Sequence, residues 1–272
     1  MQQLSISNIA WESCDEEAIL KLLKAKGVQG IEIAPTKIWP NWQDITSENL
    51  RRYRDKLHSQ GFQIPALQAI LFGYSDYKIF GSTLEQQNTL KHLRLVSDIA
   101  AELGAKVIVL GAPRNRDRGE LDETQAFAIA IDFFQEIGEY CAAQNTCLCI
   151  EPNPPTYACN FITNSQEGSR LVRAVNSAGF GLHLDAAGMH LANENLESAL
   201  RKNIDILHHF HISEPNLGNF AKPVVNHREI ALTLRNLKYS NWVSIEMRSN
   251  PNNSFEPVET VVDYCIFNYL QQ

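Results

Sequence analysis

Short apolar runs recur along the chain, each followed by a polar turn and a longer segment in which apolar residues return every three or four positions. The short runs are typical of buried strands and the longer segments of amphipathic helices. The predicted strands are residues 4–9, 30–34, 63–67, 106–110, 147–150, 181–184, 206–212 and 242–247. The clearest predicted helices are residues 16–26, 83–103, 123–143 and 165–176.

Glycines stand in the turns that precede several of these strands, at Gly27, Gly61, Gly104 and Gly179. A glycine that ends a helix just before a strand is typical of repeated βα units. Eight such units in 272 residues give 272/8 = 34 residues per unit. This is the size of a (β/α)8 barrel, which takes about 250 residues. We therefore predict an α/β protein with a single TIM barrel domain over residues 1–272.

A doubly wound open sheet is the alternative architecture for a βα repeat. Such sheets commonly carry a glycine-rich phosphate loop after a strand, written GxGxxG or GxxxxGK[ST]. None of the predicted strands is followed by either motif. The barrel is therefore the favoured prediction.

Composition and charge narrow the class of protein. The chain is 44% hydrophobic, which excludes intrinsic disorder, and its formal net charge is −7, which argues against a nucleic-acid partner. The N-terminus resembles no signal peptide and no apolar run is long enough to span a bilayer, so a cytoplasmic protein without membrane contact is expected. The six cysteines form no CxxC pair. The expected partner is a small-molecule substrate. The sequence leaves open whether the protein forms a homo-oligomer.

Four chemically related residues follow the last four predicted strands. The fifth strand runs directly into Glu151, the sixth into Asp185 and the eighth into Glu246, while the seventh ends at His211. Their spacings of 34, 26 and 35 residues are each about one βα unit. Active sites of such barrels lie at the carboxyl ends of the strands, so these side chains are expected to converge near the barrel axis.

Three carboxylates at one point would repel each other and raise one another's pKa values, and a divalent cation would remove that cost. Three carboxylate oxygens and one imidazole nitrogen suit Mn²⁺, Mg²⁺, Co²⁺ or Zn²⁺. The alternative for each residue alone is that it caps a strand or pairs with a neighbouring Lys or Arg. Because all four stand at the ends of consecutive strands, we predict one divalent metal ion held by this set.

These segments resemble a known family. Ile-Glu151-Pro-Asn, His-Leu-Asp185, Phe-His211-Ile-Ser-Glu214 and Ser-Ile-Glu246 are similar to the xylose isomerase-like barrel superfamily, and most similar to its sugar (phosphate) isomerases and epimerases, the ketose 3-epimerases included. The resemblance implies one divalent metal bound by Glu, Asp, His and Glu. It also implies that Glu151 and Glu246 are the catalytic acid/base pair on opposite faces of a sugar or sugar phosphate.

The implied chemistry is proton transfer next to a carbonyl. A Lewis acid that holds the carbonyl and hydroxyl oxygens stabilises the enediolate that forms when the proton is removed. One carboxylate then abstracts the proton and the other returns it from the opposite side, which inverts the carbon. Delivery to the neighbouring carbon would instead interconvert aldose and ketose, and the sequence leaves both outcomes open.

The sequence departs from the ketose epimerases around the substrate. They usually place a His three residues after the strand-six Asp, where this chain has Gly188 and its nearest imidazole is His190. They also tend to carry an Arg shortly after the His-x-x-Glu of strand seven, where this chain continues Pro-Asn-Leu-Gly. The metal residues match the family pattern and the residues that would grip the substrate do not.

Further candidates for substrate binding stand near the predicted strand ends. Gln68 and Arg248 follow the third and eighth strands, and Arg114 follows the fourth in a loop that also contains Arg116 and Arg118. Their alternatives are a solvated loop for Arg114 and neutralisation of Glu246 for Arg248. The full set of predicted substrate-binding residues is Glu32, Gln68, Arg114, His190, Glu214 and Arg248.

Buried roles are weighed against surface roles for the remaining candidates. Glu32 on the second strand is either a contact for a substrate hydroxyl or a buried carboxylate bonded to Arg or Lys. His183 and His209 each stand two residues before a predicted ligand, so a place one layer deeper in the barrel is expected for both. For His227 a surface position is expected.

Two rival functions remain. The superfamily also contains zinc-dependent endonucleases that act at abasic DNA sites and need additional His ligands at the ends of earlier strands. Here the third strand ends in Gln68 and the fourth in Gly111-Ala-Pro. The other rival is a metal-binding protein without catalysis, in which the carboxylates have no acid/base task.

Overall fold

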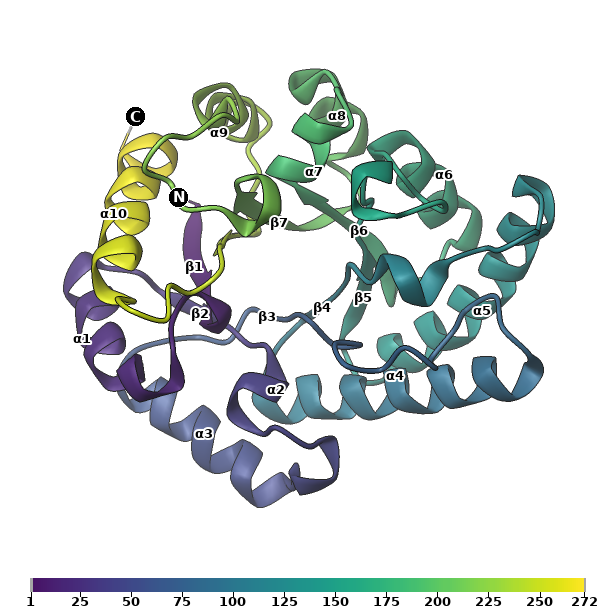
Figure 1. Cartoon of the computed structure of the whole chain (residues 1–272), viewed down its shortest axis with the longest axis horizontal. Helices are drawn as coiled ribbons and strands as arrows, with labels where there is room; N and C mark the ends of the chain where they lie inside the picture. The colour runs from purple at the N-terminus through teal and green to yellow at the C-terminus, as the bar shows by residue number, and fades with distance from the viewer. Residues whose placement is uncertain (1, 272) are drawn as a thin grey trace.

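Eight parallel strands form a nearly closed barrel in the computed structural model, which describes residues 2–271 (Figure 1). The sheet order is β2-β1-β8-β7-β6-β5-β4-β3, so neighbours along the chain are neighbours in space. Two isolated parallel bridges, Gly30 with Gln63 and Ile33 with Leu67, join the ends β2 and β3. The strands are β1 Gln3–Ser7, β2 Gly30–Glu32, β3 Ala66–Leu67, β4 Val107–Leu110, β5 Cys147–Ile150, β6 Phe180–Asp185, β7 Leu207–Ser213 and β8 Trp242–Glu246.

Helices surround the barrel, and the predicted (β/α)8 architecture is confirmed (Figure 1). Helix α10 lies beside α1, where Lys26 Nζ is 3.0 Å from Glu259 Oε1 and 2.8 Å from Asp263 Oδ1, so the ends of the chain close the ring. The helices are α1 Glu16–Lys26, α2 Pro35–Ile38, α3 Ser47–Ser59, α4 Thr83–Leu103, α5 Glu123–Ala143, α6 Ser165–Val175, α7 Ala186–Leu191, α8 Leu196–Asn203, α9 His227–Asn236 and α10 Phe255–Cys265, followed by a π-helical segment, Ile266–Leu270.

Local chemistry sets where these elements begin and end. Helix α4 starts behind a capping box, in which the Ser82 hydroxyl accepts from the Glu85 N–H while the Glu85 side chain accepts from the Ser82 N–H. It ends at Gly104, whose φ of 81° lies in the left-handed region. Strand β3 is shorter than predicted because Pro65 has no N–H to donate to the sheet. Its carbonyl still accepts from the N–H of Lys106.

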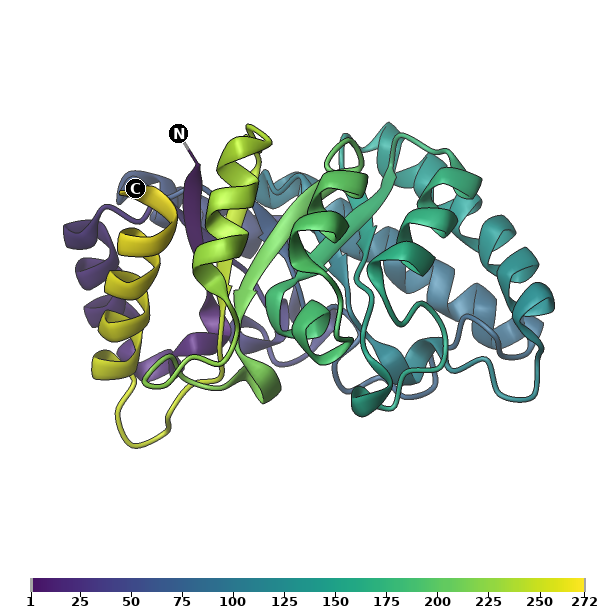
Figure 2. The same ribbon diagram turned by 90° about the horizontal axis from the view of Figure 1, so that it is seen from above.

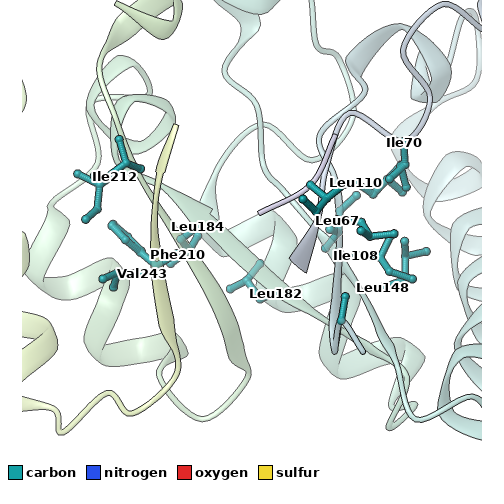
Figure 3. Packing of buried hydrophobic residues seen from close by; sticks show 14 of the residues in the cluster. Leu67, Ile70, Ile108, Leu110, Leu148, Leu182, Leu184, Phe210, Ile212 and Val243 are labelled. Carbon is teal, nitrogen blue, oxygen red and sulfur yellow. The ribbon is translucent and has the colours of Figure 1, made fainter. Parts of the chain in front are cut away.

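Alternate strand residues face the helices and form the main core. Leu182 and Leu184 of β6, Phe210 of β7 and Val243 of β8 belong to one buried cluster with residues of the surrounding helices (Figure 3). On the other side of the barrel, Leu67, Ile108 and Leu148 contribute to the same cluster. This period of two leaves the remaining strand residues pointing into the barrel lumen.

The lumen has an apolar half and a polar half. The apolar half is a separate buried cluster of small side chains from three neighbouring strands: Ala66, Val107, Val109, Cys147 and Cys149. The polar half holds buried Glu32 on β2 and three buried imidazoles on β6 and β7: His183, His209 and His211. The polar half of the lumen therefore runs from β6 through β7, β8 and β1 to β2.

The loops that follow the strands gather at one end of the barrel, along the lower edge of Figure 2. Within residues 2–271 no helix has both the length and the apolar character that crossing a membrane requires.

Gly179 lies where α5 passes the start of β6, and it offers a sharp test of this packing. A Cβ there would overlap backbone atoms of Gly138 and Ala142, which cannot move without shifting α5. We expect Gly179→Ala to lower the free energy of unfolding by about 3 kcal/mol, the upper part of the range for overpacking. Urea unfolding measures this change.

The matched control is Gly27→Ala. Gly27 has a φ of 79° and open space around a Cβ, so the cost there is limited to a left-handed alanine, about 1 kcal/mol. Equal losses in the two variants would contradict the close helix–strand approach at Gly179.

Candidate metal centre

The four residues at the ends of the last four strands come together in the structure. Glu151 follows β5 directly, Asp185 and Glu246 end β6 and β8, and His211 lies in β7. One ligand atom each from Asp185, His211 and Glu246 lie within 4.8 Å of one another, and so do those of Glu151, His183 and His211. These sets share His211, so the imidazole stands at the centre of the group.

Asp185 is fixed by two hydrogen bonds. Its Oδ1 accepts from the N–H of Gly188 at 2.6 Å, which caps α7, and its Oδ2 accepts from the Ser213 hydroxyl on β7. Gly188 occupies the position where the ketose epimerases usually carry a substrate-contacting His. In this chain its backbone N–H orients the carboxylate instead.

The Glu151 carboxylate packs tightly between Gly111, which follows β4, and the side chain of His211. A Cβ on Gly111, at the end of β4, would overlap Glu151 Oε2, so only glycine leaves room for the carboxylate in this position. The backbone carbonyl of Glu151 accepts from Arg116 Nη2 at 2.7 Å, and the same guanidinium contacts Leu110 O and Asn153 Oδ1. Arg116 is fully buried, so it joins the ends of β4 and β5 and does not reach the mouth.

Glu32 lies across the lumen, beneath His211. Its Oε1 is 3.0 Å from His211 Nε2 and its Oε2 is 3.2 Å from His209 Nε2. The partners of this fully buried carboxylate are therefore imidazoles, neither a substrate hydroxyl nor the Arg or Lys that the sequence suggested. A carboxylate on one ring nitrogen of a His orients the other nitrogen, here Nδ1, toward a ligand.

Charge in the metal-free group is poorly compensated. Burial first, then the Asp185 and Glu246 carboxylates, raise the pKa of Glu151 to about 8. Burial and Glu246 likewise raise the pKa of Asp185 to about 6. Burial alone would lower the pKa of His211, but the carboxylates of Glu32 and Glu246 raise it well above its ordinary value.

The donor set fits a divalent cation. His211 Nδ1 lies 3.3 Å from Glu246 Oε2 but makes no hydrogen bond, so a buried nitrogen is left without a partner. Three carboxylates and that nitrogen combine hard oxygen donors with a borderline nitrogen donor. The residues that could hold the ion are Glu151, Asp185, His211 and Glu246.

Two cavities open above this group, and the other predicted residues divide between them. Gln68 and Arg114 line the larger, of about 490 Å³, together with Glu151, His211 and Glu246. Arg248 lines the smaller, of about 420 Å³, which Asp185 also borders. Half-buried His190 on α7 lines neither cavity, so the structure does not bring it to the mouth.

Glu214 borders the smaller cavity but is occupied by the protein itself. Its Oε1 accepts from His227 Nε2 at 2.9 Å, and its Oε2 accepts from the Val224 N–H at 2.9 Å. Despite burial, these bonds lower the pKa of Glu214 below its ordinary value. The carboxylate predicted to bind substrate therefore anchors the loop before α9, and His227 is buried, which corrects the expected surface position.

Tyr157 lines both cavities, although from the sequence alone core packing accounts for it equally well. Its hydroxyl accepts from the Asn216 N–H at 2.9 Å and so joins the loops after β5 and β7. No spacing signal distinguishes Tyr157 from aromatic residues of the core, because its loop position depends on where Pro154 and Pro155 turn the chain.

Residues 20–263 match the family described as xylose isomerase-like TIM barrel. The chain belongs to this family. No curated protein matches the chain. Solved structures with the same fold include a D-psicose 3-epimerase in the presence of D-fructose, with a TM-score of 0.82 and 16% identity over 98% of this chain and 99% of that chain.

Two further structures share the fold. A 3-keto-D-glucoside 4-epimerase from E. coli has a TM-score of 0.78 and 18% identity over 97% of this chain and 98% of that chain. The IOLI protein with a binding zinc atom has a TM-score of 0.78 and 16% identity over 100% of both chains. At these identities the likeness establishes the fold, and the chemistry has to be argued from the residues.

The raised pKa of Glu151 predicts how the stability of the metal-free protein depends on pH. The group titrates near 4.5 when unfolded and near 8 when folded, so its contribution is complete below pH 4.5 and is lost as pH rises through 8. We expect Glu151→Gln, measured in chelator, to gain stability relative to wild type between pH 5 and 9. The gain is on the order of 1 kcal/mol or more.

Urea unfolding at several pH values measures the difference between the two proteins. Glu120→Gln, at an exposed loop position, controls for the chemical change. Parallel pH profiles for wild type and Glu151→Gln would contradict the buried, charge-crowded environment described for Glu151.

Proposed function

We propose that this protein is a divalent-metal-dependent isomerase or epimerase of keto-sugars, which acts by proton transfer at a carbon next to the carbonyl. The observation that carries the proposal is the placement of Glu151 and Glu246. The two carboxylates come from β5 and β8 and line the same cavity, while Asp185 and His211 stand on the strands between them. Each carboxylate can therefore reach a molecule bound in that cavity.

The proposed residues have two roles, binding of the metal ion and proton transfer. A divalent cation bound by Glu151, Asp185, His211 and Glu246 would supply Lewis-acid polarisation of the substrate oxygens. Glu151 and Glu246 exchange the proton, one as base and the other as acid. Without a cation, burial and neighbouring charge raise the pKa of Glu151 to about 8, and a bound divalent ion would lower that pKa and keep the carboxylate ionised, as a base requires.

Support for a sugar substrate comes from the relatives in fold. The psicose and ketoglucoside epimerases act on sugars, as their names state, and the IOLI protein binds zinc. The proposed outcome, epimerisation or aldose–ketose isomerisation, depends on which carbon receives the returned proton. Gln68 and Arg248 line the two cavities and are the residues proposed to contact sugar oxygens.

The rival endonuclease function needs further metal ligands that the described strand ends do not supply. Gln68 follows β3 with its Nε2 donating to Ser7 Oγ at 2.6 Å, and Gly111 follows β4. Within residues 2–271, the imidazoles near the four proposed ligands are His183 and His209, both buried below them. A cluster of several metals at the mouth is therefore disfavoured.

Metal content tests the proposed centre. We expect one divalent ion per chain in the purified protein, lost in His211→Ala because that change removes the central donor. Glu32→Gln is expected to weaken metal binding by about 10- to 100-fold, because it loosens the orientation of the His211 ring. Elemental analysis and competition with a chelator of known affinity measure both effects.

The control is His58→Ala, which removes an exposed imidazole from α3. Equal, low metal content in wild type and all variants, with no effect of chelator on stability, would contradict the proposed centre.

Proton exchange tests the chemistry. We expect metal-loaded protein in deuterated water to place deuterium on a carbon next to the carbonyl of a keto-sugar, followed by NMR. Glu246→Gln should slow this exchange about 10²- to 10⁴-fold per bound metal, because an acid/base group is lost. Metal content measured in the same samples separates loss of the ion from loss of proton transfer.

Glu120→Gln should exchange at the wild-type rate. A protein that binds its metal but exchanges no proton with any keto-sugar or keto-sugar derivative would contradict the proposed function and favour a metal-binding role without catalysis.

A further inference from the structure

The two cavities at the mouth are joined at the proposed reaction centre. Both are lined by Gly111, Glu151, Tyr157 and Glu246. The larger extends over the loops after β3 and β4, and we call it the apolar lobe. The smaller extends toward Asp185 and Glu214, and we call it the acidic lobe. A molecule held at Glu151 and Glu246 therefore has room to extend in two chemically different directions.

Apolar groups dominate the wall of the larger lobe. Its residues other than the four shared ones include Ala69, Ile70, Leu71, Phe72, Val109, Ala112 and Pro113. Most amide donors beside them are used within the protein. Asn115 Nδ2 uses both of its N–H groups, on the carbonyls of Tyr74 at 2.6 Å and Tyr77 at 2.7 Å, and Gln68 Nε2 gives one of its two to Ser7 Oγ. Sugar hydroxyls buried against this wall would lose water without gaining partners.

The apolar lobe is built before any ligand binds. Tyr74 stacks on Tyr77 with ring centroids 4.9 Å apart and planes inclined by 1°. Both rings pack on His92 of α4, whose Nε2 is 2.8 Å from the carbonyl oxygen of Ile70. The loop after β3 is already held by α4 and by Asn115. Ordering this loop therefore costs little of the free energy of binding when a ligand enters the lobe.

Phe72 marks the kind of group that the lobe would take. Its side chain lines the apolar lobe, yet the residue is 75% exposed. An exposed phenyl ring next to a preformed apolar wall gains from contact with an aromatic or aliphatic group of a ligand.

We propose that the substrate is a keto-sugar glycoside with an apolar aglycone, bound with its sugar at Glu151 and Glu246 and its aglycone in the apolar lobe. This inference rests on the proposed function and narrows its substrate class. A free ketose would use the acidic lobe, the shared residues and Gln68, and leave the rest of the apolar lobe filled with water.

A sugar phosphate fits the same surfaces less well. The carboxylates of Glu151, Asp185 and Glu246 outnumber the two positive charges of a bound divalent ion, and Glu214 in the acidic lobe adds a further carboxylate, so the net charge there still disfavours a phosphate. The arginines among the lining residues are Arg114 and Arg248, one in each lobe and both exposed, where water screens their charge.

A matched pair of substrates tests the proposal. Metal-loaded protein is assayed for deuterium exchange with the phenyl and the methyl glycoside of 3-keto-D-glucose, with D-fructose and D-fructose 6-phosphate in parallel. We expect kcat/KM for the phenyl glycoside to exceed that for the methyl glycoside by about tenfold or more, because only the phenyl group fills the apolar lobe. Equal values, or a phosphate that reacts faster than the phenyl glycoside, would overturn the proposal.

A pair of variants locates the preference. Phe72→Ser should reduce the phenyl-to-methyl ratio several-fold, because it removes an aromatic contact from the lobe. Phe267→Ser makes the same change at an exposed phenyl in the C-terminal π-helical segment, and should leave the ratio at its wild-type value. A ratio that Phe72→Ser does not change would overturn the proposed place of the aglycone.

Binding separates failure of this inference from failure of the proposed function. If no compound exchanges, the proposed function is contradicted, and calorimetric titration with the two glycosides still tests the lobe. Tighter binding of the phenyl glycoside that Phe72→Ser weakens supports the lobe without the chemistry. Equal affinities for the two glycosides overturn the inference whether or not exchange occurs.

Discussion

Several carboxylates are buried around one imidazole at the carboxyl end of the strands. The arrangement of the residues at this end of the barrel depends on compensating their negative charge. Parallel register places Asp185 opposite His211 and Ser213 opposite Glu246, so closure of β6, β7 and β8 forces these groups together. Neutral hydrogen-bond donors stabilise part of this negative charge. Ser213 and the Gly188 N–H each take one oxygen of Asp185, yet the pKa of Glu151 still stands near 8. The remaining charge supports the proposed cation in this group.

The same constraint explains the uneven lumen. Where β3, β4 and β5 line it, the side chains are small and apolar, so this half needs no polar partners. Where β6 and β7 line it, His209 and His211 meet Glu32 from β2 across the barrel. The polar half thus provides a rigid support for His211, and the apolar half fills the space below Glu151. Arg116 adds a third support by joining the ends of β4 and β5 through backbone carbonyls.

Sequence reasoning reaches the fold and the grouping of the four strand-end residues because both follow from short-range rules. An apolar run that ends in a carboxylate predicts a strand whose carboxylate lies at the carboxyl end of the barrel. Strands β5, β6 and β8 follow that rule. It fails for Glu32, Glu214 and Arg116, because their partners lie on elements remote in the chain. The sequence around a charged residue near a strand end does not show whether the side chain faces a substrate, as predicted for Arg114, or a backbone carbonyl, as for Arg116.

The difference between the two lobes indicates how such a site selects its substrate. A cluster of carboxylates with one cation attracts oxygen-rich, uncharged groups, and this property is common to any sugar. Selectivity among sugars has to come from the other wall, where Ala69, Phe72 and Pro113 present apolar surface in the cavity that Glu151 also lines. With Gly188 where the ketose epimerases usually carry a His, the proposed sugar has one contact fewer. Contact with a substituent on the sugar can replace it, because binding energy from a remote part of a substrate also serves the reacting carbon.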